Sequence, residues 1–355
     1  MMTDRTRPIA IDARAAARPE LGGVERWTRE LAARLPALRP GAYVVLRPPP
    51  AFVHRAGHAW EQVVLPLWAT RLGAQALLCP ANLAPLAYRR SVVVLHDAAA
   101  LRHPGWYSRT YATWQRLVLP VVARRARRLV TVSEFARREL ADLLGADAVV
   151  IPGGVDERFA PTADSEPARS AHRLGRPYVL CVASQTARKN LGALIPAARA
   201  LAADGIDVVV AGGHRPQFAR EPGLEALRLL GHVDDLLLPG LYAGAAAFAL
   251  PSRYEGFGLP VLEAMASGTP VVAAAAGALP EMCGGAAVLA EPDGEAFAAA
   301  LTGLLGDDAE RERLRAAGVE RAAGFSWDAT ARAVDALLSA ANAEPSAGTP
   351  PATAR

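Results

Sequence analysis

"AFALPSRYEGFGLPVLEAMASGTPVVAA", residues 247–274, is the most informative stretch of the chain. It begins with the apolar run "AFAL", which predicts a buried strand, and a loop that contains two glycines follows. Pro260 stands where a helix begins, Gly268 stands where that helix ends, and "PVV" opens the next apolar run. The order strand, loop, helix, strand is that of a βαβ unit, so the stretch indicates a parallel sheet with flanking helices.

The same alternation fills the chain in two series, which a polar, Pro-containing stretch at residues 156–177 separates. We therefore expect an α/β protein with two Rossmann-like βαβ domains, and the cleft between two such domains is the default ligand site. The runs that predict strands are 8–12, 42–46, 75–79, 91–97, 128–133, 148–152, 178–184, 206–213, 246–252 and 270–274.

Domain boundaries follow from this pattern. We expect an N-terminal domain at 1–160, a linker at 161–177 and a C-terminal domain at 178–325. A C-terminal helix is expected at 326–342. Residues 343–355, "AEPSAGTPPATAR", have the composition of a disordered tail.

Composition narrows the class of protein. With 355 residues, of which 52% are hydrophobic, the chain can bury two cores of ordinary size. The three cysteines stand far apart without a CxxC pair, so neither a disulfide framework nor a zinc site is encoded. The sequence shows no signal-peptide pattern and no run of about 18 apolar residues. We expect a cytoplasmic protein that does not span a membrane.

Charge is distributed unevenly along the chain. Residues 1–160 carry 23 basic and 13 acidic side chains, whereas residues 161–355 carry 16 and 22. Much of the basic excess lies at 106–129, which is either a surface helix with an Arg-rich solvated end or a patch that binds anionic membranes. No nucleic-acid-binding motif is present. The stretch contains Trp106, Tyr107, Tyr111 and Trp114, followed by Arg124, Arg125, Arg127 and Arg128.

Lys189 is the only lysine among the 39 basic side chains. A lysine kept in so Arg-rich a chain suggests a site that needs a compact point charge, such as a phosphate site, rather than the planar fork of arginine. Lys189 follows the first predicted strand of the second domain, and ligands of doubly wound sheets bind beyond the carboxyl ends of strands. Its neighbour Arg188 can share this role or face solvent.

The loop and helix start within 247–274 supply a second group of candidates. The N–H groups of Gly258 and Leu259 can receive a phosphate with the help of the helix dipole. Glu255 and Glu263 can both face the same cleft, where carboxylates accept hydrogen bonds from the vicinal hydroxyls of a sugar or ribose. Alternatively, Glu263 only stabilises the helix dipole from the first turn.

Further candidates lie in the first half of the chain. His96 and Asp97 end an apolar strand, where the imidazole either hydrogen-bonds a ligand hydroxyl or is structural. Gly22 and Gly23 precede a helix, and their N–H groups can approach a phosphate or an acceptor. Ser133 is either the N-cap of its helix or an acceptor-side residue.

Together these stretches resemble a known family. Glu255 and Glu263, with seven residues between them in "YEGFGLPVLEAMASGTPVV", are similar to the E-x7-E signature of retaining nucleotide-sugar glycosyltransferases, often called family four or glycosyl transferases group 1. The resemblance spans nearly the whole chain. It includes "GGVERWTREL", "VVVLHD", "VTVSEFARREL", "VIPGGVDERF", "ARKNL", "LGHVDDLLLPGLYAGAAAFALPSRYEGFG" and "FSWDATARAVDALL".

The resemblance implies a GT-B fold, in which two domains face each other across a cleft and the C-terminal helix crosses back to the first domain. It implies that the domain at 1–160 binds the acceptor and that the domain at 178–325 binds the nucleotide sugar. It also implies that Lys189 binds the donor diphosphate, in agreement with the stabilisation that a cation gives to charge on a leaving phosphate. The implied catalytic residues are His96, Lys189 and Glu255. The implied donor-binding residues are Gly22, Gly23, Arg188, Lys189, Val233, Glu255, Gly256, Phe257, Gly258, Leu259 and Glu263, and the implied acceptor-side residues are Asp97 and Ser133.

The mechanism that the resemblance implies is retention by front-face attack, in which the leaving phosphate takes the acceptor's proton. Because both glutamates would lie on the donor side, they do not form the carboxylate pair of a retaining hydrolase. No DxD follows a strand of the donor half, and no His/carboxylate cluster has metal spacing, so we expect no metal and no cofactor other than the donor substrate.

The chain departs from the family pattern at two places. Ser184 stands where relatives commonly have an arginine that shares the diphosphate load, and Gly153 stands where "PNGVD" has an asparagine. The "ARKN" loop and "LHDAAALRHPGWYSR" look most like mannosyl- and rhamnosyltransferases of surface-polysaccharide and glycolipid synthesis. We therefore expect GDP-mannose as donor and a saccharide or polyprenyl-lipid-linked acceptor, with peripheral contact to an anionic membrane.

Two other functions are compatible with this architecture. A sugar-nucleotide 2-epimerase has the same two domains, although its resemblance at the E-x7-E stretch would be poorer. A non-catalytic nucleotide-sugar-binding protein is the third possibility, and the presence of Lys189, Glu255, Glu263 and His96 argues against it.

Overall fold

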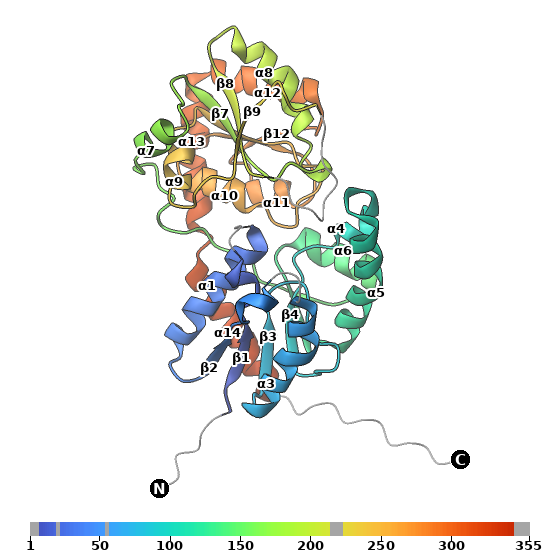
Figure 1. Ribbon diagram of the computed structural model, residues 1–355. Helices are drawn as coiled ribbons and strands as arrows, with labels where there is room; N and C mark the ends of the chain where they lie inside the picture. The colour runs from blue at the N-terminus through green and yellow to red at the C-terminus, as the bar shows by residue number, and fades with distance from the viewer. Residues whose placement is uncertain (1–6, 19–21, 54–56, 214–222, 344–355) are drawn as a thin grey trace, which may run out of the picture. The chain divides into compact units, whose positions relative to one another are not determined.

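The computed structural model describes residues 7–18, 22–53, 57–213 and 223–343, and Figure 1 shows its helices and strands. The chain forms two compact units. The first comprises the chain up to Leu95, Val121–Val130 and everything from Asp328 onward, and the second comprises His96–Pro120 and Thr131–Trp327. Apart from Ala343, the expected disordered tail lies outside the described residues.

The strands form two six-stranded sheets. The order is β2-β1-β3-β4-β5-β6 in one sheet and β12-β11-β10-β7-β8-β9 in the other. The strands are β1 (Ile9–Asp12), β2 (Tyr43–Leu46), β3 (Ala76–Cys79), β4 (Ser91–Val94), β5 (Arg128–Thr131), β6 (Val149–Val150), β7 (Tyr178–Val182), β8 (Asp207–Ala211), β9 (Arg228–Gly231), β10 (Ala247–Leu250), β11 (Val271–Ala274) and β12 (Val288–Ala290).

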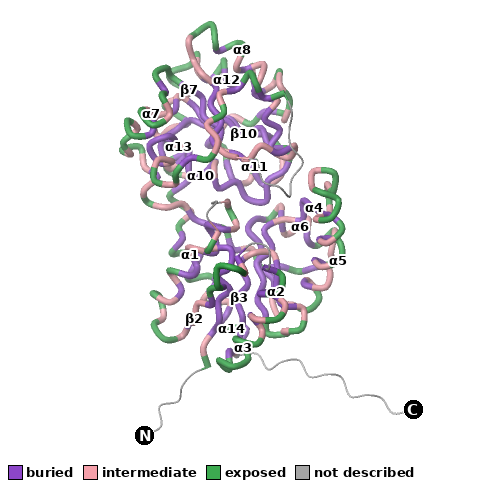
Figure 2. Tube along the Cα trace, viewed as in Figure 1, coloured by how far each residue is buried: buried purple, intermediate pink, exposed green. Residues whose placement is uncertain are grey.

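The pairing is parallel, as the alternation of strands and helices predicts. Ile9 of β1 lies opposite Tyr43 of β2 on one side and Ala76 of β3 on the other. Every residue of β1, β3, β4, β10 and β11 is buried, because helices cover both faces of a parallel sheet. Figure 2 shows the buried positions concentrated on the strands.

Helices connect most of these strands. In the sequence order of the chain they are α1 (Gly23–Leu38), α2 (Gly57–Ala59), α3 (Leu65–Arg71), α4 (Ala99–Arg102), α5 (Arg109–Arg125), α6 (Glu134–Leu144), α7 (Glu166–Ala171), α8 (Ile195–Ala202), α9 (Leu238–Ala243), α10 (Leu259–Ala266), α11 (Leu279–Cys283), α12 (Gly294–Gly306), α13 (Asp308–Ala323) and α14 (Trp327–Ala343). None of the described helices is long and apolar enough to cross a bilayer.

The structure contains all ten expected strands and adds β9 and β12, which the sequence analysis missed. Both lie at the edge of their sheet and are only partly buried, so their sequences lack the continuous apolar run of a central strand. The Arg-rich stretch is also not one helix. Helix α5 ends at Arg125, and Arg128 already belongs to β5, where it lies opposite Val92.

Helices lie in two segments that the sequence analysis gave as a linker and as a C-terminal helix. Within the expected linker, residues 166–171 form α7, which packs against α9 in the second unit. From Asp328 onward, α14 belongs to the first unit. There Arg39 Nε lies 2.7 Å from the Asp335 carboxylate, and Tyr43 donates a hydrogen bond to the same carboxylate.

Candidate functional site

Lys189 ends a short turn that follows β7, at the carboxyl end of the second sheet. The turn, Ala187–Lys189, is followed by Asn190, whose φ of 53° is left-handed, a conformation that asparagine tolerates better than most residues. The Asn190 side-chain amide donates to the carbonyl oxygens of Pro251 and Pro292, at 3.1 and 2.8 Å. These bonds hold the turn beside the loop that follows β10.

The turn and that loop bring three charged side chains together. Lys189 Nζ donates a hydrogen bond to Glu255 Oε1, and an Arg188 guanidinium nitrogen lies 3.3 Å from Glu255 Oε2. Lys189 and Glu255 are only 7% and 6% exposed. The structure therefore brings Lys189, Arg188 and Glu255 together. Arg188 contacts Glu255 and does not face solvent alone.

Burial and charge act in opposite directions on this cluster. Burial raises the pKa of the Glu255 carboxyl, but the charges of Lys189 and Arg188 outweigh it, so the pKa lies below its ordinary value. Burial lowers the pKa of the Lys189 ammonium, and the attraction of Glu255 offsets this only in part. Burial opposes the charge on Arg188, but the carboxylates of Glu255 and Asp97 raise its pKa. Two cationic side chains therefore stand at this strand end, where they can meet an anionic ligand.

Arg188 holds a further donor for such a ligand. One of its terminal nitrogens donates to the Tyr254 carbonyl at 3.0 Å, whereas its buried Nε has no hydrogen-bond acceptor among the described residues. A buried donor without an acceptor is costly, so an anion that supplies one would be stabilised here.

The glycines of the loop allow close backbone approach. A Cβ at Gly256 would lie 2.4 Å from the His96 carbonyl oxygen, and Ser133 Oγ donates to the Gly256 carbonyl at 2.6 Å. Ser133 also accepts a hydrogen bond from Ala136 N at 3.0 Å, so it is the N-cap of α6 as well as a neighbour of this loop. Asp97 lies beside Gly256 and accepts a hydrogen bond from Ala99 N at 3.0 Å.

Helix α10 begins at the end of the same loop, as the sequence predicts. Its N-cap is Gly258, with a φ of 107°, and Pro260 lies in its first turn. Glu263 lies beyond that first turn. The alternative interpretation of Glu263, as an acid that only stabilises the helix dipole from the first turn, is therefore wrong. Its Oε2 accepts a hydrogen bond from Tyr242 at 2.9 Å, and both side chains are buried.

The remaining candidates lie in different surroundings. Val233 is buried in the core of the second unit, two residues after β9. Phe257 packs edge-on against Phe325, with ring centroids 6.1 Å apart. Gly22 is the N-cap of α1 and Gly23 its first residue, both in the first unit, where Gly22 N donates to Glu25 at 3.1 Å. His96 is 8% exposed at the end of the segment after β4.

Sequence reasoning missed three neighbours of the charged cluster. These are Asn190, which fixes the turn, and Tyr107 and Tyr254. Both tyrosines lie close enough to Arg188 to affect its pKa. The only signal was the "WYSR" and "RYEG" context of the tyrosines, which does not reveal a tertiary contact.

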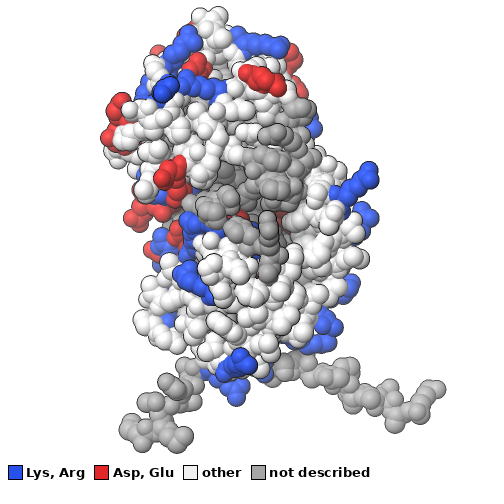
Figure 3. Space-filling view, viewed as in Figure 1, with Lys and Arg blue, Asp and Glu red and all other residues white. Residues whose placement is uncertain are grey.

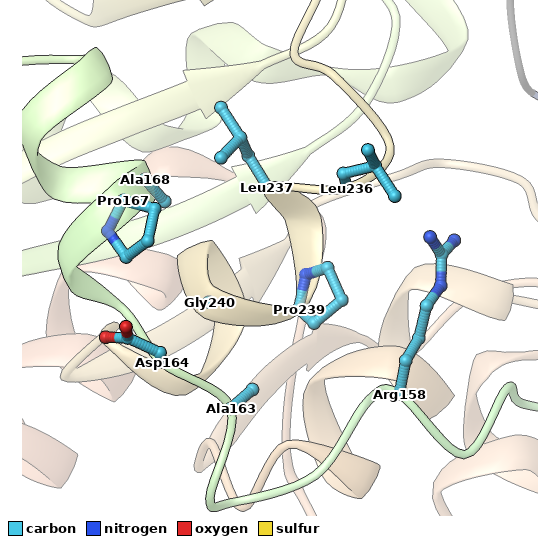
Figure 4. Close-up of a pocket in the computed structure, with 9 residues that line it drawn as sticks. All are labelled: Arg158, Ala163, Asp164, Pro167, Ala168, Leu236, Leu237, Pro239 and Gly240. Atoms are coloured by element: carbon cyan, nitrogen blue, oxygen red, sulfur yellow. The ribbon is translucent and has the colours of Figure 1, made fainter.

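The described residues outside this cluster hold a pocket but no metal cluster. A pocket of about 370 Å³ lies between α7 and α9 (Figure 4), but no candidate residue lines it. Among the described residues, no group of three or more His, Cys, Asp or Glu side chains could hold a metal ion. The pocket is lined by Arg158, Ala163, Asp164, Pro167, Ala168, Leu236, Leu237, Pro239 and Gly240.

Comparison with known proteins gives a consistent result. The family model described as glycosyl transferases group 1 matches residues 176–307, and that described as glycosyltransferase family 4 matches residues 21–159. O-antigen chain mannosyltransferase B of Escherichia coli is 32% identical over 261 residues, which cover 69% of this chain and 68% of that protein. Phosphatidyl-myo-inositol mannosyltransferase of Mycobacterium leprae is 32% identical over 57% of this chain and 56% of its own length.

The fold has solved counterparts. Sucrose-phosphate synthase from Thermosynechococcus elongatus superposes with a TM-score of 0.75 at 21% identity, over 94% of this chain and 99% of that chain. At this identity the likeness shows the fold alone, which is the GT-B fold.

Proposed function

Because the chain belongs to the family-four glycosyltransferases, we propose that it transfers a hexose from a nucleotide-diphosphate sugar to a saccharide or lipid-linked acceptor, with retention of configuration. The observation that carries this proposal is the buried Lys189–Glu255 pair, flanked by Arg188, at the carboxyl end of the second sheet. The start of α10 follows Glu255 within a few residues and offers N–H groups to the same kind of ligand.

In the proposed reaction, Lys189, Arg188 and the start of α10 bind the donor diphosphate. The acceptor hydroxyl oxygen bonds to the anomeric carbon as the bond from that carbon to the diphosphate oxygen breaks, and the hydroxyl proton passes to the departing phosphate. Negative charge grows on the diphosphate during this step, and the preorganised cations stabilise it. Glu255 accepts hydrogen bonds from sugar hydroxyls and keeps Lys189 oriented.

We propose mannose as the transferred sugar and GDP as the carrier, without a metal ion. The names of the two bacterial relatives, both mannosyltransferases, support the choice of sugar. The absence of a DxD after the strands of the donor half supports metal independence.

A donor panel tests these points. The protein is incubated with GDP-mannose, UDP-glucose and dTDP-rhamnose, with and without a mannoside or polyprenyl-linked acceptor, and with and without EDTA. Acceptor-dependent GDP release from GDP-mannose that EDTA does not reduce is the expected result, and NMR of the product reports the anomeric configuration. An epimerised nucleotide sugar would favour the epimerase instead, and binding without turnover would favour the binding protein.

A lipid-linked acceptor would require contact with a membrane surface, which we propose α5 provides. This helix carries four arginines and no acidic residue, and Arg109, Arg116, Arg124 and Arg125 are exposed. Figure 3 shows basic side chains along the edge that α5 forms. Anionic lipids attract such a row by about 1 kcal/mol for each arginine near the surface.

Vesicle cosedimentation tests this contact. Binding should rise with the phosphatidylglycerol content of the vesicles and fall when Arg124 and Arg125 are replaced by glutamine. Binding that ignores both lipid charge and these substitutions would remove the membrane from the proposal.

A further inference from the structure

Tyr254 connects the charged cluster to a group of aromatic residues that takes no part in the reaction proposed above. Its backbone carbonyl accepts the hydrogen bond from Arg188 at 3.0 Å, and the N–H of Arg253, the residue before it, donates to the Arg188 carbonyl at 3.0 Å. Tyr254 is only 3% exposed. The backbone at 253–254 is therefore bonded to Arg188 at two points, so the position of Tyr254 affects the direction of the guanidinium.

Three other aromatic rings pack against the Tyr254 ring. Those of Phe135, His103 and Trp106 lie nearly perpendicular to it, with centroids 5.1, 6.0 and 6.4 Å away. Aromatic pairs favour this geometry and these distances. His103 and Trp106 also stack on each other at 4.0 Å. These three residues form what we call the aromatic cage, and they lie in the same unit as Tyr254.

Helix α6 supplies one side of the cage. Phe135 and Glu139 are four residues apart on this helix, so both project from the same face. The Tyr254 phenol donates to Glu139 Oε2 at 3.3 Å, and Arg102 holds the same carboxylate with two donors, at 3.1 and 2.8 Å. The Glu281 carboxylate accepts two N–H bonds from the first turn of α6, at 2.9 and 3.0 Å. This side of the cage is thus fixed at both the helix start and the carboxylate.

We propose that Tyr254 is a positioning residue for Arg188. The aromatic cage fixes the Tyr254 ring, the ring fixes the backbone carbonyl, and the carbonyl orients the guanidinium toward the donor diphosphate. A guanidinium is a rigid planar fork of donors, so one bonded nitrogen restricts the direction of the others. Among these is the buried Nε, which has no acceptor among the described residues. A donor that is oriented before the anion binds need not reorganise afterwards.

Binding of inorganic pyrophosphate, measured by calorimetry in metal-free buffer, tests this role without the transfer reaction. The inference rests on the proposed binding of a diphosphate by this cluster. Tyr254→Ala should raise the Kd about tenfold, because a hydrogen bond between charged groups is weakened but not removed. Tyr254→Phe should bind like the wild type, since the phenol bond that it loses is long for an O–H donor.

A second background shows whether the effect passes through Arg188. Arg188→Met removes the guanidinium and leaves Lys189 as the partner of Glu255. In this background Tyr254→Ala should change the Kd by less than about twofold, because there is no guanidinium left to orient. If Tyr254→Ala raises the Kd by the same factor in both backgrounds, Tyr254 acts independently of Arg188 and the proposal is wrong.

Two more variants control for folding. Trp106→Ala opens the cage but keeps Tyr254, so it replaces Tyr254→Ala if circular dichroism shows that variant to be unfolded, and the same dependence on Arg188 is expected. Tyr88→Ala is the matched control, because Tyr88 belongs to the first unit and its phenol donates to the Ala74 carbonyl at 3.2 Å. An equal rise in Kd for Tyr88→Ala would mean a general loss of stability and would overturn the proposal.

The transfer assay separates this inference from the proposed reaction. If no nucleotide sugar is consumed, but pyrophosphate binds and Tyr254→Ala weakens binding only when Arg188 is present, the positioning role stands and the reaction fails. If GDP-mannose is turned over while Tyr254→Ala binds pyrophosphate as tightly as the wild type, the reaction stands and the positioning role fails. The positioning role also fails if the wild-type protein does not bind pyrophosphate.

Discussion

Replacing Lys189 by methionine removes the ammonium group and keeps most of the side-chain volume. Glu255 then retains Arg188, at 3.3 Å, as its cationic partner. Removing one partner of a buried ion pair costs about 3–5 kcal/mol of stability. Because Arg188 still neutralises Glu255 in part, we expect a loss of stability near the lower end of this range, about 3 kcal/mol. If Lys189 also stabilises the leaving diphosphate, kcat should fall by about 10²–10³.

A double variant separates these two effects. In Lys189→Met/Glu255→Gln the buried carboxylate is neutral as well, so most of the lost stability should return. The rate should not return, because the cation that the transition state needs is still absent. Lys189→Arg retains the charge but not the compact ammonium, and at a position only 7% exposed we expect it to lose most turnover.

Urea unfolding, followed by tryptophan fluorescence and circular dichroism, gives the stability of each variant, and GDP release at saturating donor gives kcat. If kcat in the double variant recovers together with stability, Lys189 is structural and its assignment to the diphosphate is wrong. A near-wild-type rate for Lys189→Arg would refute the need for a point charge.

Three further variants test other parts of the structure. Burial raises the pKa of Asp12 from 3.8 to about 6, so the fold loses stability as pH rises across that range. Asp12→Asn should abolish this pH dependence and stabilise the protein at pH 8 by up to about 3 kcal/mol, which urea unfolding at pH 5 and pH 8 would measure. Gly256→Ala should lower kcat/KM sharply, because the added Cβ would lie 2.4 Å from the His96 carbonyl oxygen. Gly105→Ala is the control: its Cβ would meet no atom within 4 Å, and its kcat/KM should equal that of the wild type. Ser133→Ala should cost about 1 kcal/mol in urea unfolding through the lost helix cap, and an unchanged midpoint would contradict this.

Much of the fold was predictable from the sequence because central parallel strands need continuous apolar runs. Strand β10 ends at Leu250, α10 begins at Leu259 next to Pro260, and Gly268 has the left-handed φ of 68° that a helix end favours. Edge strands β9 and β12 carry no such signal. The end of α5 before Arg128 agrees with the expected strand at 128–133, although the Arg-rich stretch 106–129 was also interpreted as one surface helix.

The site was predictable in location but not in its contacts. The rule that ligands bind at strand carboxyl ends brought Lys189 and Glu255 to one edge of the sheet. Their direct pairing depends on the left-handed Asn190 and its bonds to two distant carbonyls, which no local pattern encodes. In the same way, the hydrogen bond from Tyr242 to Glu263 depends on the packing of α9 against α10.

Because Lys189 is the only lysine, the protein has a single side-chain amine. An amine-selective acylating reagent reacts with this side chain and with the terminal α-amine, so peptide mapping is needed to follow the one that lies in the candidate donor site. Its Nζ is buried and hydrogen-bonded to Glu255, so the labelling rate measures how often the turn at 187–189 opens. The native, unmodified sequence thus carries its own chemical reporter, and slower acylation in the presence of a nucleotide sugar would measure donor binding without any engineered probe.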